Sequence, residues 1–525
     1  MSLNLETISG IGKATAESLR AAGIDSVQKL AKAKLEELLE IKGIGKSTAE
    51  KYIEIAKDLL DEAEVIEVGP EEVKSPISKE TYPVEKKEKK PKTQKKEQKE
   101  DISVKKFEKL LKKQAECNIG LVGHVDHGKT TLVKSLTGDW TDRHSEEQER
   151  GISIKLGYSN ATILYCPECD VYTTLHLIEK ARKKGQPRYR CPDCQGQVEF
   201  KRNISFVDAP GHEILMATML SGASLMDGAC LLIAADEPCP QPQTREHLAA
   251  LDIAGIENII IIQNKIDAVS REDAIQNQKE IKKFVEGTVA DEAPIIPISA
   301  VFGANIELII KAFQDIIPTP AFDSEEDFQF LIARSFDVNK PGTEIDRLIG
   351  GVIGGSVLRG KITVGEEIEI RPGLKGKNEY EPIKSKVISI SQGNNFLEEA
   401  KPGGLIGLGT KLDPALTKSD ALIGQLVGKI GKLPTVRKDI ELEVHLLDRV
   451  IGAEEMIKVH ELKHGERLLM VVGTEKVAGV VSKILKDTYK IDLNPPVCVP
   501  DISIFAISRI INRRYRLIGY GIPVD

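Results

Sequence analysis

The stretch GHVDHGKT, from Gly123 to Thr130, has the residue types and spacing of a loop that holds phosphate groups. It follows an apolar run and opens a stretch of helix formers, as the pattern G-x-x-x-x-G-K-[ST] requires. In such a loop the backbone amides surround the phosphates, the lysine reaches the β- and γ-phosphates, and the hydroxyl ligates Mg²⁺. We therefore predict that Lys129 contacts phosphate and that Thr130 ligates magnesium. The other loop residues predicted to bind the nucleotide are Asp126, His127, Gly128 and Thr131.

A second motif, NKID, indicates which base the nucleotide carries. The Asp267 carboxylate can accept from the ring N1–H and the 2-amino group of guanine together, a pair of donors that adenine does not offer. Asn264 and Lys265 are expected to support the base, and the run ISA, with Ser299 and Ala300, places a backbone amide near guanine O6. Alone, four residues also fit a surface turn. Downstream of a phosphate loop they favour guanine, so we predict GTP as the substrate and GDP as the product.

Two further stretches are typical of segments that respond to the γ-phosphate. In DAPGH, Asp208 is expected to hold Mg²⁺ through water, and the Gly211 amide to contact the γ-phosphate. His212 follows directly and is predicted to orient the attacking water, although a lone histidine is more often structural. In RGISIKLGY, Ser153 is predicted to be a second hydroxyl ligand of the metal.

Four of the eight cysteines form two C-P-x-C pairs in CPECDVYTTLHLIEKARKKGQPRYRCPDC. Disulfides, redox chemistry and a metal are the alternatives. A reducing compartment disfavours disulfides, and redox pairs normally occur singly at a helix start in a redox fold. Two C-x-x-C pairs about twenty residues apart match a tetrahedral structural zinc site. The predicted zinc ligands are Cys166, Cys169, Cys191 and Cys194, in a knuckle over 166–194, whereas Cys117, Cys230, Cys239 and Cys498 read as small apolar residues.

These residues must be positioned by several domains, because 525 residues are too many for one core. Apolar runs such as NIGLVG, NISFVDAPG and GACLLIAAD alternate with helical patterns, which predicts a doubly wound α/β domain over 115–320. Short β-branched runs punctuated by glycine follow, and they predict two β-barrels, over 321–433 and 434–525. The predicted fold class is multidomain: an α-helical N-terminal module, an α/β P-loop GTPase domain with a zinc knuckle insertion, and two C-terminal barrels.

The first sixty residues contain a repeat, SGIGKATAESL and KGIGKSTAEKY, offset by 33 positions. Each copy reads as a Gly-x-Gly hairpin that opens an amphipathic helix, which predicts a tandem helix-hairpin-helix module over 1–60. Such hairpins can hold nucleic-acid phosphate, with Lys13 and Lys46 assisting, but a protein-docking module fits equally well. The lysine-rich stretch over 61–114 has little to bury and reads as a solvated linker, or as a tether that follows RNA phosphates.

The chain has no run of eighteen apolar residues, and its N-terminus lacks the basic start and apolar core of a signal peptide. We therefore expect a cytoplasmic protein with no membrane partner. The formal net charge of −7 argues weakly against a chain-wide polyanion binder and leaves room for local basic patches.

Taken together, these motifs resemble the gamma subunit of archaeal and eukaryotic translation initiation factor 2. The resemblance runs from about Cys117 to the end and is carried by CNIGLVGHVDHGKTTLVKSLTG, WTDRHSEEQERGISIKLGY, the paired cysteines, VDAPGHEILMATMLSGASLMDGACLLIAA, ARSFDVNKPGTEIDRLIGGVIGGSVLRGKI and INRRYRLIGYG. It implies GTP-dependent delivery of methionyl initiator tRNA to the small ribosomal subunit, within a heterotrimer containing alpha and beta subunits. The N-terminal module and the linker are not part of the usual family pattern.

Other functions fit parts of the sequence. An elongation-type GTPase carrying another aminoacyl-tRNA is the nearest alternative, and the zinc insertion argues against it. A recombination or repair protein built around the hairpin module would use ATP, which NKID contradicts. A regulatory GTPase scaffold without tRNA is the third. The run RRYR, over 513–516, fits either a contact to the tRNA backbone or a solvated strand end.

Overall fold

The computed structural model forms two compact units, Met1–Pro91 and Lys92–Asp525. The structure describes 13–22, 24, 29–30, 33, 38, 49, 52, 104–139, 157–183, 186–209, 216–223, 225–340, 342–344, 347–377, 379–393, 395–448, 450, 457–500, 503–512 and 514–524.

In the first unit, helix α1 (Lys13–Ala21) begins directly after the first Gly-x-Gly repeat. Its Leu19 is fully buried, as are Leu30 and Leu38 further along the unit. Buried apolar residues within and between the repeats therefore form the core of a small helical module, as predicted.

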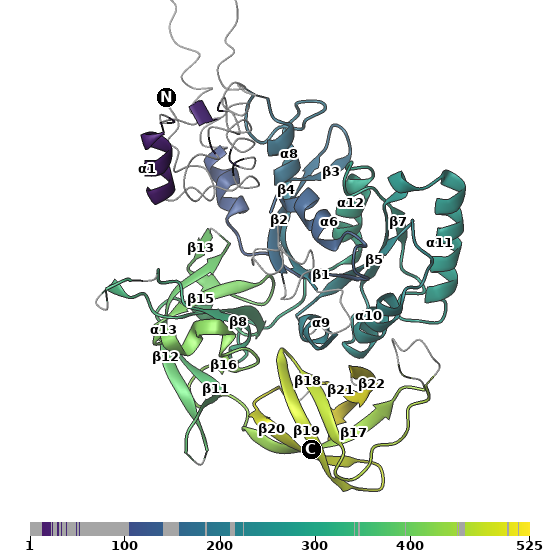
Figure 1. The fold of residues 1–525 in the computed structure, drawn as a ribbon, viewed down its shortest axis with the longest axis vertical. Helices are drawn as coiled ribbons and strands as arrows, with labels where there is room; N and C mark the ends of the chain where they lie inside the picture. The colour runs from purple at the N-terminus through teal and green to yellow at the C-terminus, as the bar shows by residue number, and fades with distance from the viewer. Residues whose placement is uncertain are drawn as a thin grey trace, which may run out of the picture. The chain divides into compact units, whose positions relative to one another are not determined.

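The second unit begins with a seven-stranded sheet in the order β3-β2-β4-β1-β5-β6-β7 (Figure 1). Strand β1 is parallel to β4 and β5, and β6 and β7 continue the parallel part. Strand β2 pairs antiparallel with both β4 and β3. The strands are β1 (Asn118–Gly123), β2 (Gly157–Cys166), β3 (Val171–Thr174), β4 (Glu199–Asp208), β5 (Gly228–Ala234), β6 (Ile259–Asn264) and β7 (Ile295–Pro297). The helices are α6 (Lys129–Thr137), α8 (Leu175–Ala181), α9 (Met216–Ala223), α10 (Pro242–Ile253), α11 (Arg271–Val285) and α12 (Ile306–Ile316).

Helices cover both faces of the parallel strands, which explains long apolar runs such as the one in β5. In β5, Leu231 and Ile233 belong to one core with residues of α9, α10 and α11. Cys230 and Leu232 point into the other core, with residues of α6 and α12. Successive side chains of a strand face opposite sides, so a strand buried on both sides needs a continuous apolar run.

Two barrels follow, and they confirm the predicted fold class. The first closes through the order β11-β16-β8-β9-β15-β12 and the pairing of β11 with β12; the second has the order β17-β20-β19-β18-β21-β22. The first contains β8 (Gln329–Phe336), β9 (Val352–Arg359), β10 (Ile362–Thr363), β11 (Glu367–Lys375), β12 (Tyr380–Gln392), β13 (Asn395–Leu397), β14 (Glu399–Ala400), β15 (Ile406–Thr410), α13 (Pro414–Thr417) and β16 (Leu426–Gly428). The second contains β17 (Arg437–Leu446), β18 (Arg467–Val472), β19 (Glu475–Ile484), β20 (Tyr489–Val497), β21 (Phe505–Ile511) and β22 (Arg514–Pro523).

Both barrels contact the α/β domain through buried polar groups. The Ala115 amide, just before β1, donates to Gln392 Oε1 of the first barrel at 2.6 Å. Arg516 of the second barrel forms an ion pair of 2.8 Å with Glu246 of α10. The arginine side chain is 13 % exposed, so this part of RRYR is neither a solvated strand end nor a free contact for RNA. In the sequence, Arg516 is one of several basic residues, and nothing indicates that its partner is Glu246, 270 positions away.

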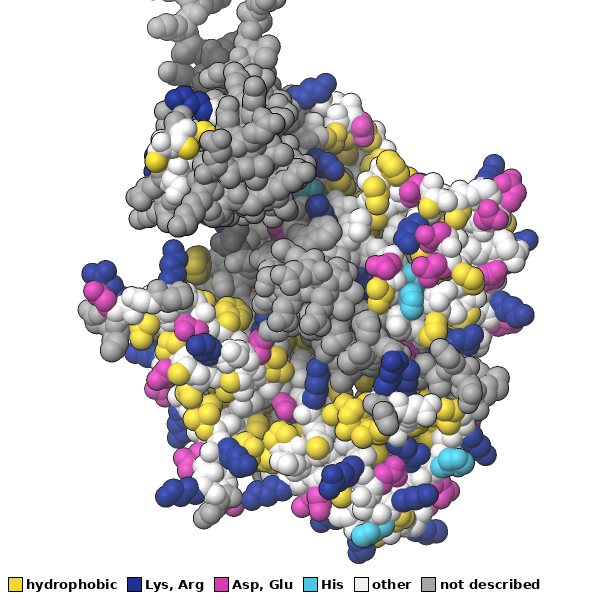
Figure 2. All heavy atoms as spheres, viewed as in Figure 1, with side chains coloured by type: hydrophobic (Ala, Val, Ile, Leu, Met, Phe, Trp, Pro, Cys, Tyr) yellow, Lys and Arg dark blue, Asp and Glu magenta, His cyan; other side chains and the backbone are white. Residues whose placement is uncertain are grey.

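The surface carries mixed charge. Figure 2 shows Lys and Arg side chains interspersed with Asp and Glu over the described part of the face in view. Among the helices that the structure describes, none combines the length and the apolar character that crossing a bilayer demands.

Two glycines of the first barrel provide a test of the strand packing. Gly373 in β11 has φ +91°, and a Cβ there would lie 1.9 Å from the backbone oxygen of Glu381 on β12. Gly365 has φ +96° and no atom within 4 Å of such a Cβ. Alanine at Gly365 costs about 1–2 kcal/mol for the positive φ alone, whereas alanine at Gly373 must also separate two paired strands. We expect the thermal unfolding midpoint of Gly373→Ala to lie about 5 °C or more below that of Gly365→Ala. Equal midpoints would contradict this packing.

Candidate functional site

The phosphate loop joins the end of β1 to the start of α6, the strand–loop–helix context that the sequence predicts. Three of its residues have positive φ: Gly123 at +142°, Asp126 at +61° and Gly128 at +88°. A Cβ on Gly128 would lie 2.3 Å from Asn264 Nδ2, so the loop can pass this side chain only with glycine.

Lys129 and Thr130 direct their polar groups to the two sides of the loop. The Lys129 ammonium donates to the carbonyl oxygens of Gly123 at 3.0 Å and His124 at 2.7 Å, which holds it within the loop. The Thr130 hydroxyl donates to Asp208 Oδ2 at 2.7 Å. Asp208 is fully buried at the end of β4. It lies beside β1, where the parallel register pairs it with Leu121.

The chemistry of this pair suits a hard divalent cation. Hydroxyl and carboxylate oxygens are ligands that Mg²⁺ prefers, and water and phosphate oxygens would complete an octahedral shell. The residues present therefore fit magnesium at the side of the loop where Thr130 and Asp208 meet.

Asn264 connects the phosphate loop to the loop predicted to face the base. Its Nδ2 donates to the His127 carbonyl at 2.9 Å, and its Oδ1 accepts from the Ala300 amide at 3.1 Å. Ala300 N–H was the amide expected near guanine O6, and it is used here by Asn264, so its role toward the base stays a prediction. Ser299 is buried and accepts from the Phe302 amide at 3.2 Å.

The remaining residues of NKID differ in exposure. Lys265 has φ +62° and forms an ion pair of 3.1 Å with Asp236. Asp267 lies in a single 3-10 turn, Ile266–Ala268, and is exposed. Its carboxylate is thus presented to solvent, where a base can approach it.

Beside these loops lies a hollow of about 820 Å³. Thr131 of α6 and Ala300 line one part of it, and the cysteine insertion lines another. Val301 and Phe302, also in its lining, are 72 % and 77 % exposed. Large apolar side chains with this exposure form a surface against which a flat ring, such as a nucleotide base, can stack.

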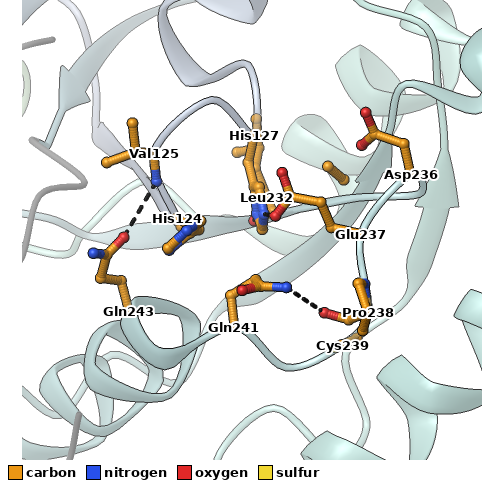
Figure 3. Close-up of polar contacts among 12 residues, drawn as sticks. His124, Val125, His127, Leu232, Asp236, Glu237, Pro238, Cys239, Gln241 and Gln243 are labelled. Atoms are coloured by element: carbon orange, nitrogen blue, oxygen red, sulfur yellow. Dashed lines mark hydrogen bonds and ion pairs between the residues drawn. The ribbon is translucent and has the colours of Figure 1, made fainter. Parts of the chain in front are cut away.

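Two histidines, His127 in the loop and His247 on α10, make side-chain contacts that the sequence did not reveal. His127 is buried, and its Nδ1 lies 2.9 Å from the Leu232 carbonyl, which can only accept, so this nitrogen carries the hydrogen. Its Nε2 lies 3.3 Å from Glu237 Oε2, and Figure 3 labels both residues. His247 of α10 accepts from the Gly123 amide through Nδ1 at 2.7 Å. The only sequence signal for His247 is its place on a helix face that it shares with Gln243, Thr244 and Leu251.

Gly211, His212 and Ser153 lie outside the described residues, so their predicted roles toward the γ-phosphate, the attacking water and the metal stay predictions.

The four paired cysteines converge at the end of β2. Their Sγ atoms all lie within 4.8 Å of one another, with Cys166 and Cys194 at 3.5 Å and Cys169 and Cys191 at 3.9 Å. A tetrahedral zinc with Zn–S bonds of about 2.3 Å separates sulfurs by roughly 3.8 Å, whereas a disulfide needs about 2.05 Å. The geometry fits zinc and excludes disulfide bonds among these four.

Among the described residues, the buried apolar core around the cluster is small and includes Leu164, Ile178 and Val198. A bound metal would add folding free energy that so small a core does not supply.

With this geometry in hand, the chain can be compared with known proteins. Residues 114–319 match the Elongation factor Tu GTP binding domain, 350–428 match Elongation factor Tu domain 2, and 438–523 match the C-terminal domain of initiation factor eIF2 gamma. Residues 2–58 match the SAM-like helix-hairpin-helix tandem.

Several similar proteins are gamma subunits of translation initiation factor 2. Translation initiation factor 2 subunit gamma of Pyrococcus abyssi is 56 % identical over 419 residues, which cover 79 % of this chain and 99 % of that protein. The subunit of the same name from Methanocaldococcus jannaschii is 55 % identical over 413 residues, 78 % of this chain and 97 % of that protein. About a fifth of this chain therefore lies outside the match.

Solved structures with a similar fold include a bacterial selenocysteine-specific elongation factor, at a TM-score of 0.58 and 22 % identity over 78 % of this chain and 58 % of that one. Elongation factor SelB of Methanococcus maripaludis, in complex with the GTP analogue GppNHp, has a TM-score of 0.56 and 22 % identity over 78 % of this chain and 79 % of that one. At this identity the likeness shows the fold alone. The identity to the gamma subunits along nearly their whole length decides the family: this chain is a translational GTPase and belongs to the gamma subunits of translation initiation factor 2.

Proposed function

We propose that this protein, with GTP bound, carries methionyl initiator tRNA to the small ribosomal subunit, as one member of a heterotrimer with alpha and beta subunits. The observation that carries the proposal is the 56 % identity to the Pyrococcus abyssi gamma subunit over 99 % of its length. The proposed cofactors are Mg²⁺ with GTP or GDP, and Zn²⁺ in the cysteine cluster.

In the proposed site, the phosphate loop holds the nucleotide. Lys129 neutralises charge on the β- and γ-phosphates, and Thr130 and Asp208, in contact at 2.7 Å, hold the magnesium together with Ser153. Magnesium, when bound, neutralises charge that develops on the phosphoryl oxygens. His212 orients the attacking water, and Gly211 contacts the γ-phosphate.

Asp267 supplies the choice of guanine, because its exposed carboxylate can accept from two donors of that base. Asn264 fixes the phosphate loop and the Ala300 loop relative to each other through its two hydrogen bonds. Lys265, already paired with Asp236, contributes its aliphatic stem to the pocket.

An elongation-type GTPase is the second candidate, since the similar solved structures are elongation factors of the same fold. The cysteine cluster and the identity to initiation gamma subunits favour initiation.

Filter binding with two tRNAs tests the proposed function. We expect retention of methionyl initiator tRNA with a GTP analogue, weaker retention with GDP, and little retention of methionyl elongator tRNA. Equal retention of the two tRNAs would transfer the assignment to the elongation class, and equal retention with both nucleotides would contradict a GTP-dependent carrier.

Asp267→Asn is the matched variant for the same assay. An amide NH₂ repels the guanine 2-amino group but can donate to the 2-oxo group of xanthine. Loss of a charge-assisted pair costs about 2–3 kcal/mol, or roughly 30- to 150-fold in GTP affinity. Initiator tRNA retention should fail at limiting GTP analogue and return with the xanthosine analogue. A variant that keeps wild-type dependence on guanine would refute the role of Asp267.

Metal content tests the proposed zinc site. We expect about one zinc per wild-type chain by elemental analysis, and none in Cys169→Ser/Cys191→Ser, because a serine hydroxyl is a poor zinc ligand. The thermal unfolding midpoint should fall as well, since the insertion has a small core. Cys239→Ser, outside the cluster, is the control and should keep its zinc. Stoichiometric zinc in the double variant would refute the site.

For the N-terminal module we propose a contact to RNA phosphates, supported by its match to a helix-hairpin-helix tandem over 2–58. Removing 1–100 should weaken binding to ribosomal RNA and flatten its dependence on salt, because fewer counterions are released. Lys13→Ala/Lys46→Ala in the full chain should reproduce part of the loss. An unchanged affinity at every salt concentration would leave a protein-docking role instead.

A further inference from the structure

Two neighbouring side chains of helix α10, Glu246 and His247, contact different domains. Glu246 forms its ion pair with Arg516 on β22 of the C-terminal barrel. His247 accepts from the Gly123 amide, at the first residue of the phosphate loop. Adjacent residues of a helix point about 100° apart, so one helix can contact both the loop and the barrel.

At the loop end, α10 holds two backbone amides. Gly123 N–H donates to His247 Nδ1 at 2.7 Å, and Val125 N–H lies 3.5 Å from Gln243 Oε1 (Figure 3 draws the second contact). His247 is 1 % exposed. Burial lowers the pKa of His247 well below its usual value, and the nearby charge of Lys129 lowers it further, so the ring is neutral and Nδ1 keeps the lone pair that the amide needs.

At the barrel end, the ion pair is almost closed to solvent. The Glu246 and Arg516 side chains are 4 % and 13 % exposed, and their contact distance is 2.8 Å. A charge buried in this way depends on its partner, because neither group can recover its hydration without moving. The position of α10 is therefore tied to β22.

Apolar packing reinforces this end of the helix. Leu248 and Leu251 of α10 belong to the same buried cluster as Val471, Ala506 and Leu517 of the barrel. A cavity of about 340 Å³, lined by Ala250 and Ile253 of α10 and by Val471 and Ala506 of the barrel, interrupts this packing, so the Glu246–Arg516 ion pair supplies the part of the connection that the apolar contacts do not.

We propose that α10 transmits the position of the C-terminal barrel to the phosphate loop: His247 is a positioning residue for the nucleotide, and the Glu246–Arg516 pair keeps the helix where His247 reaches Gly123. The inference rests on the proposed nucleotide site and adds to it a residue of another domain, Arg516, that governs nucleotide retention without touching the nucleotide.

Release of a fluorescent GDP from the full-length protein tests the loop end. His247→Ala removes the acceptor for Gly123 N–H, and we expect release about 5- to 10-fold faster, the equivalent of one buried hydrogen bond. His247→Asn can place an amide oxygen near the position of Nδ1 and should return the rate to within about twofold of wild type. His464→Ala, at an exposed position, is the control. Equal release from His247→Ala and wild type would overturn the role of His247.

The barrel end is tested by Arg516→Met and by Glu246→Gln, which keeps the volume of the side chain. Each should speed GDP release about three- to tenfold while the circular dichroism spectrum stays unchanged. Arg467→Met, an exposed arginine on β18 of the same barrel, should release GDP at the wild-type rate. Unchanged release in a folded Glu246→Gln protein would overturn the link.

A double-mutant cycle separates the link from two independent effects. If Arg516 acts through His247, Arg516→Met should add little to His247→Ala, whereas fold-changes that multiply would show that α10 does not connect them. Failure of the wild-type protein to bind GDP would instead refute the proposed nucleotide site, so the two failures are distinguishable.

Discussion

One side-chain amide sets the geometry on which the candidate site depends. Asn264 donates to the phosphate loop at His127 and accepts from the Ala300 amide, so two loops that follow different strands are held at a fixed spacing. The same side chain leaves no room for a Cβ at Gly128, which is why the loop needs glycine there. Because both loops leave the carboxyl ends of parallel strands, the sheet aligns them and Asn264 completes the arrangement.

Much of this could be read from the sequence, because the signals are local. A strand buried on both faces needs a nearly continuous apolar run, so NIGLVG and GACLLIAAD predicted parallel strands. The spacing of glycine and lysine in GHVDHGKT predicted a loop between a strand and a helix. The cysteine cluster followed from two short C-x-x-C spacings about twenty residues apart. The barrels followed from short strands and turn glycines. All of these patterns lie within a few tens of residues.

The interactions that the sequence did not show join distant positions. Arg516 pairs with Glu246 across 270 positions, and in the sequence it is only one basic residue in RRYR. His247 shares its helix face with both polar and apolar residues, and nothing nearby in the sequence indicates that its partner is the backbone amide of Gly123. Backbone amides leave no trace in sequence patterns. Partners chosen by tertiary contact can be found only once the register of strands and helices is known.

The hollow beside the loops gives the cysteine cluster a significance beyond local folding. Cys166 and Cys191 line it together with Thr131 and Ala300. One wall of the hollow is thus built partly from thiols. Peroxide or another oxidant that converts these sulfurs to sulfenic or sulfinic acids would place polar oxygens in that wall and would remove the thiolates that a zinc ion would require.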